Sequence, residues 1–138
     1  MAQVGSMPDD PDEVIRRAYE AYGRGDLATM LELIDPDLEW TYLDPAFEHP
    51  DPQVCHGRDE LATALRRQQR QGLRSELEEV IVDGDRAAVV VRTPGLDAHR
   101  AWQADDRNFD VITVRGGRIV ALRACRDREE AMAVLSPA

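Results

Sequence analysis

The chain lacks several features that would place a protein in a class at once. It has only two cysteines, Cys55 and Cys125, which lie far apart and form no spacing typical of a metal site. No stretch approaches the ~18 consecutive apolar residues of a membrane span. Residues 1–7 have neither the basic region nor the apolar core of a signal peptide. These absences predict a cytoplasmic protein with two unpaired thiols.

The chain also has fewer basic than acidic residues. The chain has 17 basic and 27 acidic residues, for a formal net charge of −10. A field of that sign repels nucleic acids and anionic membrane surfaces, so we expect neither as a partner. At 138 residues, 43% of them hydrophobic, the chain is long enough to bury a core without disulfides or metal. We expect one domain over residues 10–136, after a flexible tail at residues 1–9.

The first half of the chain carries the start and stop signals of helices. Asp10 is a helix-capping residue, and Pro11 suits the first helical position. Asp26 caps a second helix, which Pro36 ends. Gly57 precedes the third. The expected helices cover residues 11–22, 26–35 and 58–71.

The remainder of the chain shows the two-residue period of strands. Turn signals occur at Asp83-Gly84 and at Gly116-Gly117. Residues 44–56 contain three prolines and are expected to form a loop. A short terminal helix is expected to start at Asp127. The expected strands cover residues 38–42, 73–82, 85–93, 99–115 and 118–126.

Five short segments carry a family resemblance through their order. They are Gly-Arg-Gly-Asp-Leu at 23–27, Asp-Pro-Asp-Leu-Glu-Trp at 35–40, Gly-Arg-Asp-Glu-Leu at 57–61, Arg-Gly-Gly-Arg-Ile-Val at 115–120 and Asp-Arg-Glu-Glu-Ala at 127–131. In this order the chain resembles the SnoaL-like branch of the nuclear transport factor 2-like superfamily, over about residues 11 to 135.

The resemblance implies an α+β fold. Its cone-shaped, curved antiparallel sheet would be covered by three helices, with a short C-terminal helix. It also implies a homodimer through the outer face of the sheet, an apolar pocket for a small hydrophobic ligand, and neither a metal nor a cofactor. Because this fold hosts several chemistries, activity must be argued from side chains.

Enzymes that share the resemblance place an acid or base inside the cone. Against ketosteroid isomerases, Asp110 matches the protonated acid and Tyr42 stands at the position of the base. Ala18 stands where those enzymes have a tyrosine, and Tyr19 is its neighbour. We therefore expect Asp110 and Tyr42 to be catalytic. The activity would be that of an isomerase or cyclase acting on a carbonyl compound, with non-catalytic ligand binding as the alternative.

A limonene epoxide hydrolase-like activity is a further alternative. Arg92 matches the arginine of that pattern, and Ala124 falls at the position of its last-strand aspartate.

The environment of Asp110 depends on the register of the last hairpin. With a simple two-residue turn at Gly116-Gly117, Asp110 lies opposite Arg123, and a salt bridge follows. A one-residue change instead puts Leu122 and Ala124 on its face. In that case the carboxyl group lines the cone, and burial favours a raised pKa. The sequence leaves both registers open.

Other side chains are candidates for contact with a ligand. Trp40 and Tyr42 alternate correctly to point into the cone, and an aromatic ring there can stack on a planar ligand. Arg92 would attract an anionic group if it faced inward and would be a surface charge if it faced outward. The predicted ligand-binding residues are Trp40, Tyr19, Trp102, Arg92, Arg123, Leu122 and Ala124.

A cluster of metal-ligand types stands in the proline-containing loop. It consists of His49, Asp51, Cys55 and His56. Their spacing matches no standard zinc site, so no metal is expected.

Overall fold

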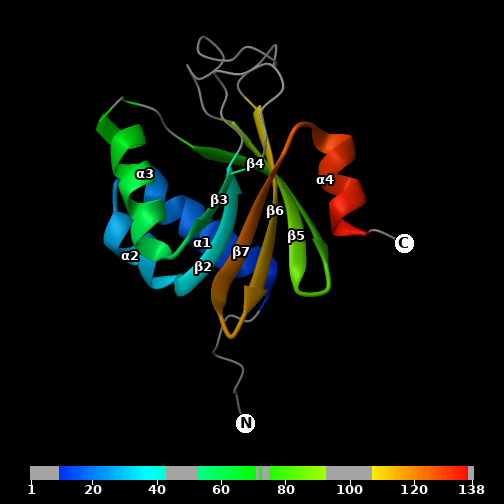
Figure 1. Ribbon diagram of the computed structural model, residues 1–138, viewed down its shortest axis with the longest axis horizontal. Coiled ribbons are helices and arrows are strands. Elements are labelled where there is room, and N and C mark those ends of the chain that lie inside the picture. The colour runs from blue at the N-terminus through cyan, green and yellow to red at the C-terminus, as the bar shows by residue number, and fades with distance from the viewer. Residues whose placement is uncertain (1–9, 43–52, 71, 73–74, 93–106, 137–138) are drawn as a thin grey trace.

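The computed structural model describes residues 10–42, 53–70, 72, 75–92 and 107–136. These residues form a mixed α+β fold, in which α1, α2 and α3 lie on one face of a curved, unclosed sheet and α4 lies on the other (Figure 1). The helices are α1 (Pro11–Gly23), α2 (Leu27–Glu32), α3 (Arg58–Arg70) and α4 (Arg128–Leu135). The strands are β2 (Ile34–Tyr42), β3 (Gln53–His56), β4 (Glu76–Asp83), β5 (Arg86–Arg92), β6 (Arg107–Arg115) and β7 (Arg118–Cys125).

The sheet has the strand order β3-β2-β7-β6-β5-β4. Neighbouring strands of this sheet pair antiparallel, except that β2 and β7 pair in parallel. The expected curved antiparallel sheet thus contains one parallel pair. The two strands are far apart in the sequence, so no tight hairpin forces them to run in opposite directions.

Three helices start at the acidic residues that the sequence indicates. The Asp10 carboxylate accepts a hydrogen bond from the Asp12 amide at 3.1 Å at the start of α1. Asp26 accepts from the Thr29 amide at 3.1 Å at the start of α2. Asp127 accepts from a main-chain amide in the same way at the start of α4. Each cap satisfies a donor that the first turn of a helix leaves without a partner.

Strand β2 begins earlier than expected, at Ile34 instead of residue 38, and contains Pro36. Its pairing with β7 shifts register between Ile34 and Glu39. A proline is tolerated there because its missing N–H is not needed in a regular ladder. Within this irregular stretch, the Asp35 carboxylate accepts a hydrogen bond from the Asp37 amide at 2.8 Å.

The prediction of a loop over residues 44–56 is wrong at its end. Residues 53–56 form β3, a short edge strand in which Cys55 pairs with Trp40 of β2. Four residues directly after prolines carry too little periodic signal to indicate a strand. The neighbouring β2 supplies the pairing that makes them one.

The other expected strands agree in place with small changes of boundary. The β4–β5 turn consists of Gly84 and Asp85, because Asp83 pairs with Arg86. Gly84 has a φ of 66°, which explains the glycine at this turn. The strand expected over residues 99–115 is described from Arg107 onward, as β6.

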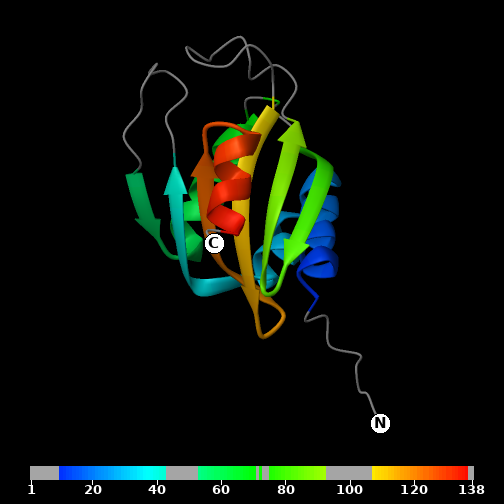
Figure 2. The same cartoon turned by 90° about the vertical axis from the view of Figure 1, so that its right-hand side faces the viewer.

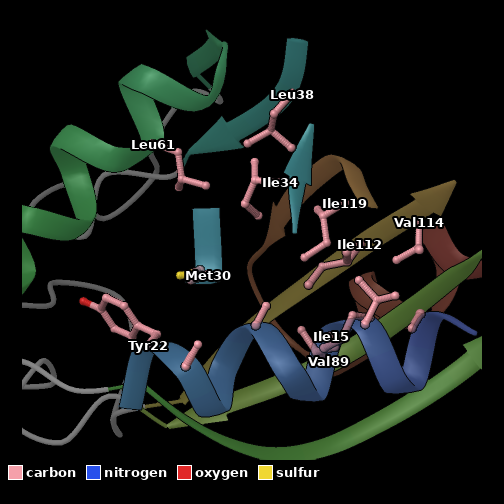
Figure 3. Close-up of a cluster of buried hydrophobic side chains, with 14 of the residues drawn as sticks. Ile15, Tyr22, Met30, Ile34, Leu38, Leu61, Val89, Ile112, Val114 and Ile119 are labelled. Atoms are coloured by element: carbon pink, nitrogen blue, oxygen red, sulfur yellow. The ribbon is translucent and has the colours of Figure 1, made fainter. Parts of the chain in front are cut away.

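The main core lies between the inner face of the sheet, which we define as the face covered by α1, α2 and α3, and those helices (Figure 3). One buried part of it is the apolar end, defined as Ile34, Val114 and Ile119, one from each of three neighbouring strands. Their exposed fractions are 1%, 2% and 2%. Burial of such side chains is the main source of stability in a fold of this size.

A smaller cluster lies on the outer face, under α4 (Figure 2). There Val111 and Cys125 pack against Leu135 of the helix. Both cysteines are free thiols, as expected. Burial raises the pKa of the Cys125 thiol to about 12, with further contributions from Glu130 and Asp110.

Candidate functional site

The structure resolves the register around Asp110. The β6–β7 turn has two residues, since Arg115 pairs with Arg118, but the register shifts between Thr113 and Val114. Asp110 consequently pairs with Ala124, and Arg123 pairs with Val111. Of the two registers that the sequence leaves open, the structure has the one with Leu122 and Ala124 on the face of Asp110, because an irregularity inside the hairpin adds one residue that the turn alone does not reveal.

Asp110 stands on the inner face, where it pairs with the buried Val89 of β5 on one side and with the half-buried Ala124 of β7 on the other. We call five half-buried residues the polar end of the inner face: Tyr19, Trp40, Asp110, Leu122 and Ala124. Trp40 and Leu122 pack against the main core, and Leu122 pairs with both Trp40 and Ile112. The carboxyl group of Asp110 is thus set in a largely apolar wall.

Tyr19 of α1 approaches Asp110 across the inner face. Burial raises the pKa of the Tyr19 phenol above its ordinary value, and the charge of Asp110 raises it further. Both effects disfavour the phenolate, so Tyr19 stays protonated at neutral pH. A protonated phenol beside a carboxyl group provides a hydrogen-bond donor and a proton-transfer group in one place.

Tyr19 is one residue away from the position that matches the catalytic tyrosine of the isomerases. This offset predicts that its side chain leaves the helix in a different direction. The structure instead brings Tyr19 near Asp110, while its neighbour Ala18 is fully buried in the core. A side chain as long as tyrosine reaches sideways from the helix, so a one-residue offset does not exclude it.

Trp40 contributes both an aromatic ring and a buried indole nitrogen to the polar end. Its position in β2 is opposite Cys55 on one side and Leu122 on the other. Cys55 is half-buried, and its thiol pKa is raised by burial and by the charge of Glu60. It is therefore a poor nucleophile at neutral pH.

Two predicted ligand-binding arginines lie away from the polar end. Arg92 is exposed at the end of β5 and alternates with Val91, which belongs to the inner core. Arg123 is exposed in β7. Both therefore belong to the outer face, and neither contributes to the polar end.

The remaining predicted residues lie partly or wholly outside the described residues. Tyr42 is the last residue of β2, where it pairs with Gln53, and its side chain lies outside what the structure describes. Trp102, His49 and Asp51 also lie outside the described residues. Within the described ranges, no three histidine, cysteine or acidic side chains come together as a potential metal site.

One polar contact near the inner face was not anticipated. The hydroxyl of Tyr22 in α1 donates a hydrogen bond to the Gln68 Oε1 atom at 3.0 Å and lies 3.4 Å from the Leu65 carbonyl oxygen, both in α3. The sequence contains a signal for it, because Leu61, Leu65 and Gln68 recur at helical spacing and form one inward stripe.

The geometry defines a class of protein: a small α+β fold whose curved sheet holds one carboxyl and one protonated phenol against an apolar wall. Residues 15–122 match the model of the SnoaL-like domain family. The chain belongs to that family, and the resemblance inferred from its five segments is confirmed.

Curated relatives occur in mycobacteria. The chain is 29% identical over 128 residues to the ECF RNA polymerase sigma factor SigJ of Mycobacterium tuberculosis, covering 88% of this chain but only 40% of the sigma factor. It thus spans less than half the length of that relative. It is 32% identical over 121 residues to an uncharacterized protein of the same organism, covering 84% of this chain and 88% of the relative.

Solved structures with the same fold include two informative examples. One is an NTF2-like protein of unknown function from Burkholderia pseudomallei, at 26% identity and a TM-score of 0.63, covering 93% of this chain and 98% of that one. The other is IdmH of Streptomyces antibioticus, whose suggested activity is that of a polyketide cyclase. Its identity is 24% and its TM-score 0.64, with coverage of 90% and 96%. At that identity it shows the fold alone.

None of the described helices has both the length and the hydropathy needed to cross a bilayer.

Proposed function

We propose that this chain is a cofactor-independent enzyme that binds a small, largely apolar carbonyl compound at the polar end of the inner face and transfers a proton within it. The observation that carries the proposal is the approach of the Tyr19 phenol to Asp110 within an apolar surround. Isomerisation and ring closure of carbonyl compounds both begin with such a proton transfer.

The step requires no partner beyond the two side chains. The Asp110 carboxylate accepts a proton from the carbon next to the carbonyl group, and the C–H electron pair moves to form an enolate. Tyr19 donates a hydrogen bond to the enolate oxygen, where the negative charge develops. Asp110 then returns the proton to a different carbon. In ring closure, the enolate carbon instead attacks a second carbonyl carbon of the same molecule, the C=O π electrons move to that oxygen, and Asp110 gives its proton to the resulting alkoxide.

The surrounding side chains suit a flat apolar molecule. Trp40 offers a ring for stacking, and Leu122 and Ala124 offer apolar contact beside Asp110. Tyr42 and Trp102 stay predicted contributors to this site.

Solvent hydrogen exchange tests the proposal and does not require the product to be identified. A panel of cyclic ketones is incubated with the protein in D₂O, and deuterium uptake next to the carbonyl group is followed by proton NMR. We expect exchange that falls about a hundredfold in Asp110→Asn and about tenfold in Tyr19→Phe, which are ordinary effects for a proton-transfer group and for an oxyanion donor. Asp37→Asn, at an exposed carboxylate elsewhere on β2, serves as the matched control and should leave the rate unchanged.

Full exchange in Asp110→Asn would sink the enzymatic proposal. Binding of a ketone without any exchange would instead favour the second candidate, a non-catalytic ligand-binding domain. One observation supports that candidate specifically. The match to SigJ means that a related sequence occurs within a much longer protein named as a sigma factor, where a ligand sensor would be useful.

We also propose that the protein is a cytoplasmic homodimer that pairs through the part of the outer face not covered by α4. That part includes Glu39 and Arg123, which are exposed and opposite in charge. Sedimentation velocity would show a dimer that weakens with salt, because exposed ion pairs are screened. A monomer at all salt concentrations would remove this part of the proposal.

A further inference from the structure

The two halves of α3 are attached to the rest of the protein very differently. In the N-terminal half, Leu61 and Ala62 are buried. The turn before the helix is also fixed, since the Gly57 amide donates to the Leu38 carbonyl oxygen at 2.6 Å. The His56 amide donates to the Glu60 carboxylate at 2.6 Å, which ties the first turn to β3.

The C-terminal half of α3, residues 65–70, has one apolar contact and one polar contact. Leu65 is half-buried against the inner core. The Tyr22 hydroxyl meets Gln68 and the Leu65 carbonyl oxygen. No other side-chain hydrogen bond or ion pair joins residues 65–70 to the rest of the described residues. The remaining residues of this half are exposed: Arg66, Arg67, Gln69 and Arg70.

The Tyr22 end of the contact is rigid. Tyr22 is 5% exposed and belongs to the inner core (Figure 3), and burial raises the pKa of its phenol, so it remains a donor. Gln68 is half-buried on a helix half with few other anchors. Local opening is expected where few buried apolar contacts hold an element, and the C-terminal half of α3 meets that condition.

The position of this half makes its opening useful. Leu65 packs against the same core as Trp40 and Tyr19, and α3 contacts β2, the strand that carries Trp40. Moving this half of α3 away would therefore open that core on the side of the helix. We propose that the C-terminal half of α3 is a movable wall of the inner-face site, that the Tyr22–Gln68 hydrogen bond is the latch that holds it closed, and that a ligand enters by opening it. The proposal rests on the proposed function only in taking the polar end as the ligand site.

The latch can be tested without any substrate. In a Trp102→Phe background, Trp40 is the one fluorescent tryptophan, and its quenching by acrylamide reports access of a small neutral molecule to the polar end. Tyr22→Phe removes only the donor hydroxyl, and Gln68→Met removes the acceptor while keeping a side chain of similar length. Gln69→Met, the exposed neighbour on the same helix, is the matched control.

We expect Tyr22→Phe and Gln68→Met to raise the quenching constant at least twofold. They should also raise amide hydrogen exchange of residues 65–70 about fivefold, as expected when an opening equilibrium loses one neutral hydrogen bond. Exchange in α4 should not change, which separates local opening from global unfolding. Gln69→Met should change neither readout.

Two results would overturn the proposal. One is unchanged quenching and unchanged exchange in both latch variants. The other is a rise in exchange that is equal in α3 and α4, since that would mean general destabilisation. Failure of the ketone-exchange experiment leaves this test intact, because neither readout involves turnover.

Discussion

The two ends of the inner face have the same curved sheet beneath them and opposite character. At the apolar end, Ile34, Val114 and Ile119 are nearly inaccessible. At the polar end, Trp40, Asp110 and Leu122 are half-buried, and a carboxyl group and a phenol stand among apolar side chains. The two ends therefore differ in exposure: the apolar end is sealed from water, whereas the polar end leaves part of its aromatic and polar side chains exposed.

The largest effect should come from the apolar end. Ile119→Ala removes a side chain that is 2% exposed. The main chain at this position is held as well, because the Ile119 amide donates to the Leu33 carbonyl oxygen at 2.8 Å. We expect the free energy of unfolding to fall by about 3 kcal/mol, measured by urea denaturation. As a control, Val82→Ala at an exposed strand position should change it by no more than about 0.5 kcal/mol. Equal losses would mean that the apolar end is not the stabilising region.

A pH effect of intermediate size should come from Tyr19. The pKa of the Tyr19 phenol is raised in the folded state. At a pH between the unfolded pKa of about 10 and the folded pKa, the folded protein therefore keeps a proton that the unfolded chain has lost. Stability contributed by the protonated phenol is therefore complete below pH 10 and falls as pH rises. At pH 11 wild type should have lost about 1.4 kcal/mol more than Tyr19→Phe, because all other titrating groups are shared. Parallel stability profiles from pH 9 to 11 would show that Tyr19 is not desolvated.

The smallest loss of stability should come from truncating Leu122 at the polar end. Leu122→Ala truncates a side chain of the same volume class as Ile119 but only half-buried. We expect a loss of about 1 kcal/mol in the free energy of unfolding, because less apolar area returns to water. A loss as large as that of Ile119→Ala would erase the distinction between the two ends.

Much of the fold was predictable because its signals are local. The helix caps Asp10, Asp26 and Asp127 and the hairpin glycines act within a few residues, so the sequence indicates where elements begin. Strand β3 and the parallel β2–β7 pair were not predictable in the same way. They depend on contacts between segments distant in the sequence.

The sequence could name candidate residues for a site but not the geometry that surrounds them. Asp110 and Tyr19 were both candidates, yet the register that puts Ala124 opposite Asp110 follows from an irregularity inside the hairpin. No turn signal reports it. The reach of Tyr19 to Asp110 also depends on how α1 crosses the sheet, a tertiary property that helical periodicity leaves open.

Carbon NMR of tyrosine can test whether Tyr19 and Asp110 act as one electrostatic unit, as the proposed function requires. Protein labelled with ¹³C at the tyrosine Cζ position is titrated through acidic pH, with Tyr22→Phe and Tyr42→Phe used to assign the Tyr19 signal. We expect the Tyr19 resonance to move as the Asp110 carboxyl group changes its charge, and this movement to disappear in Asp110→Asn. A Tyr19 resonance that is insensitive to pH in wild type, or that moves identically in Asp110→Asn, would contradict this expectation.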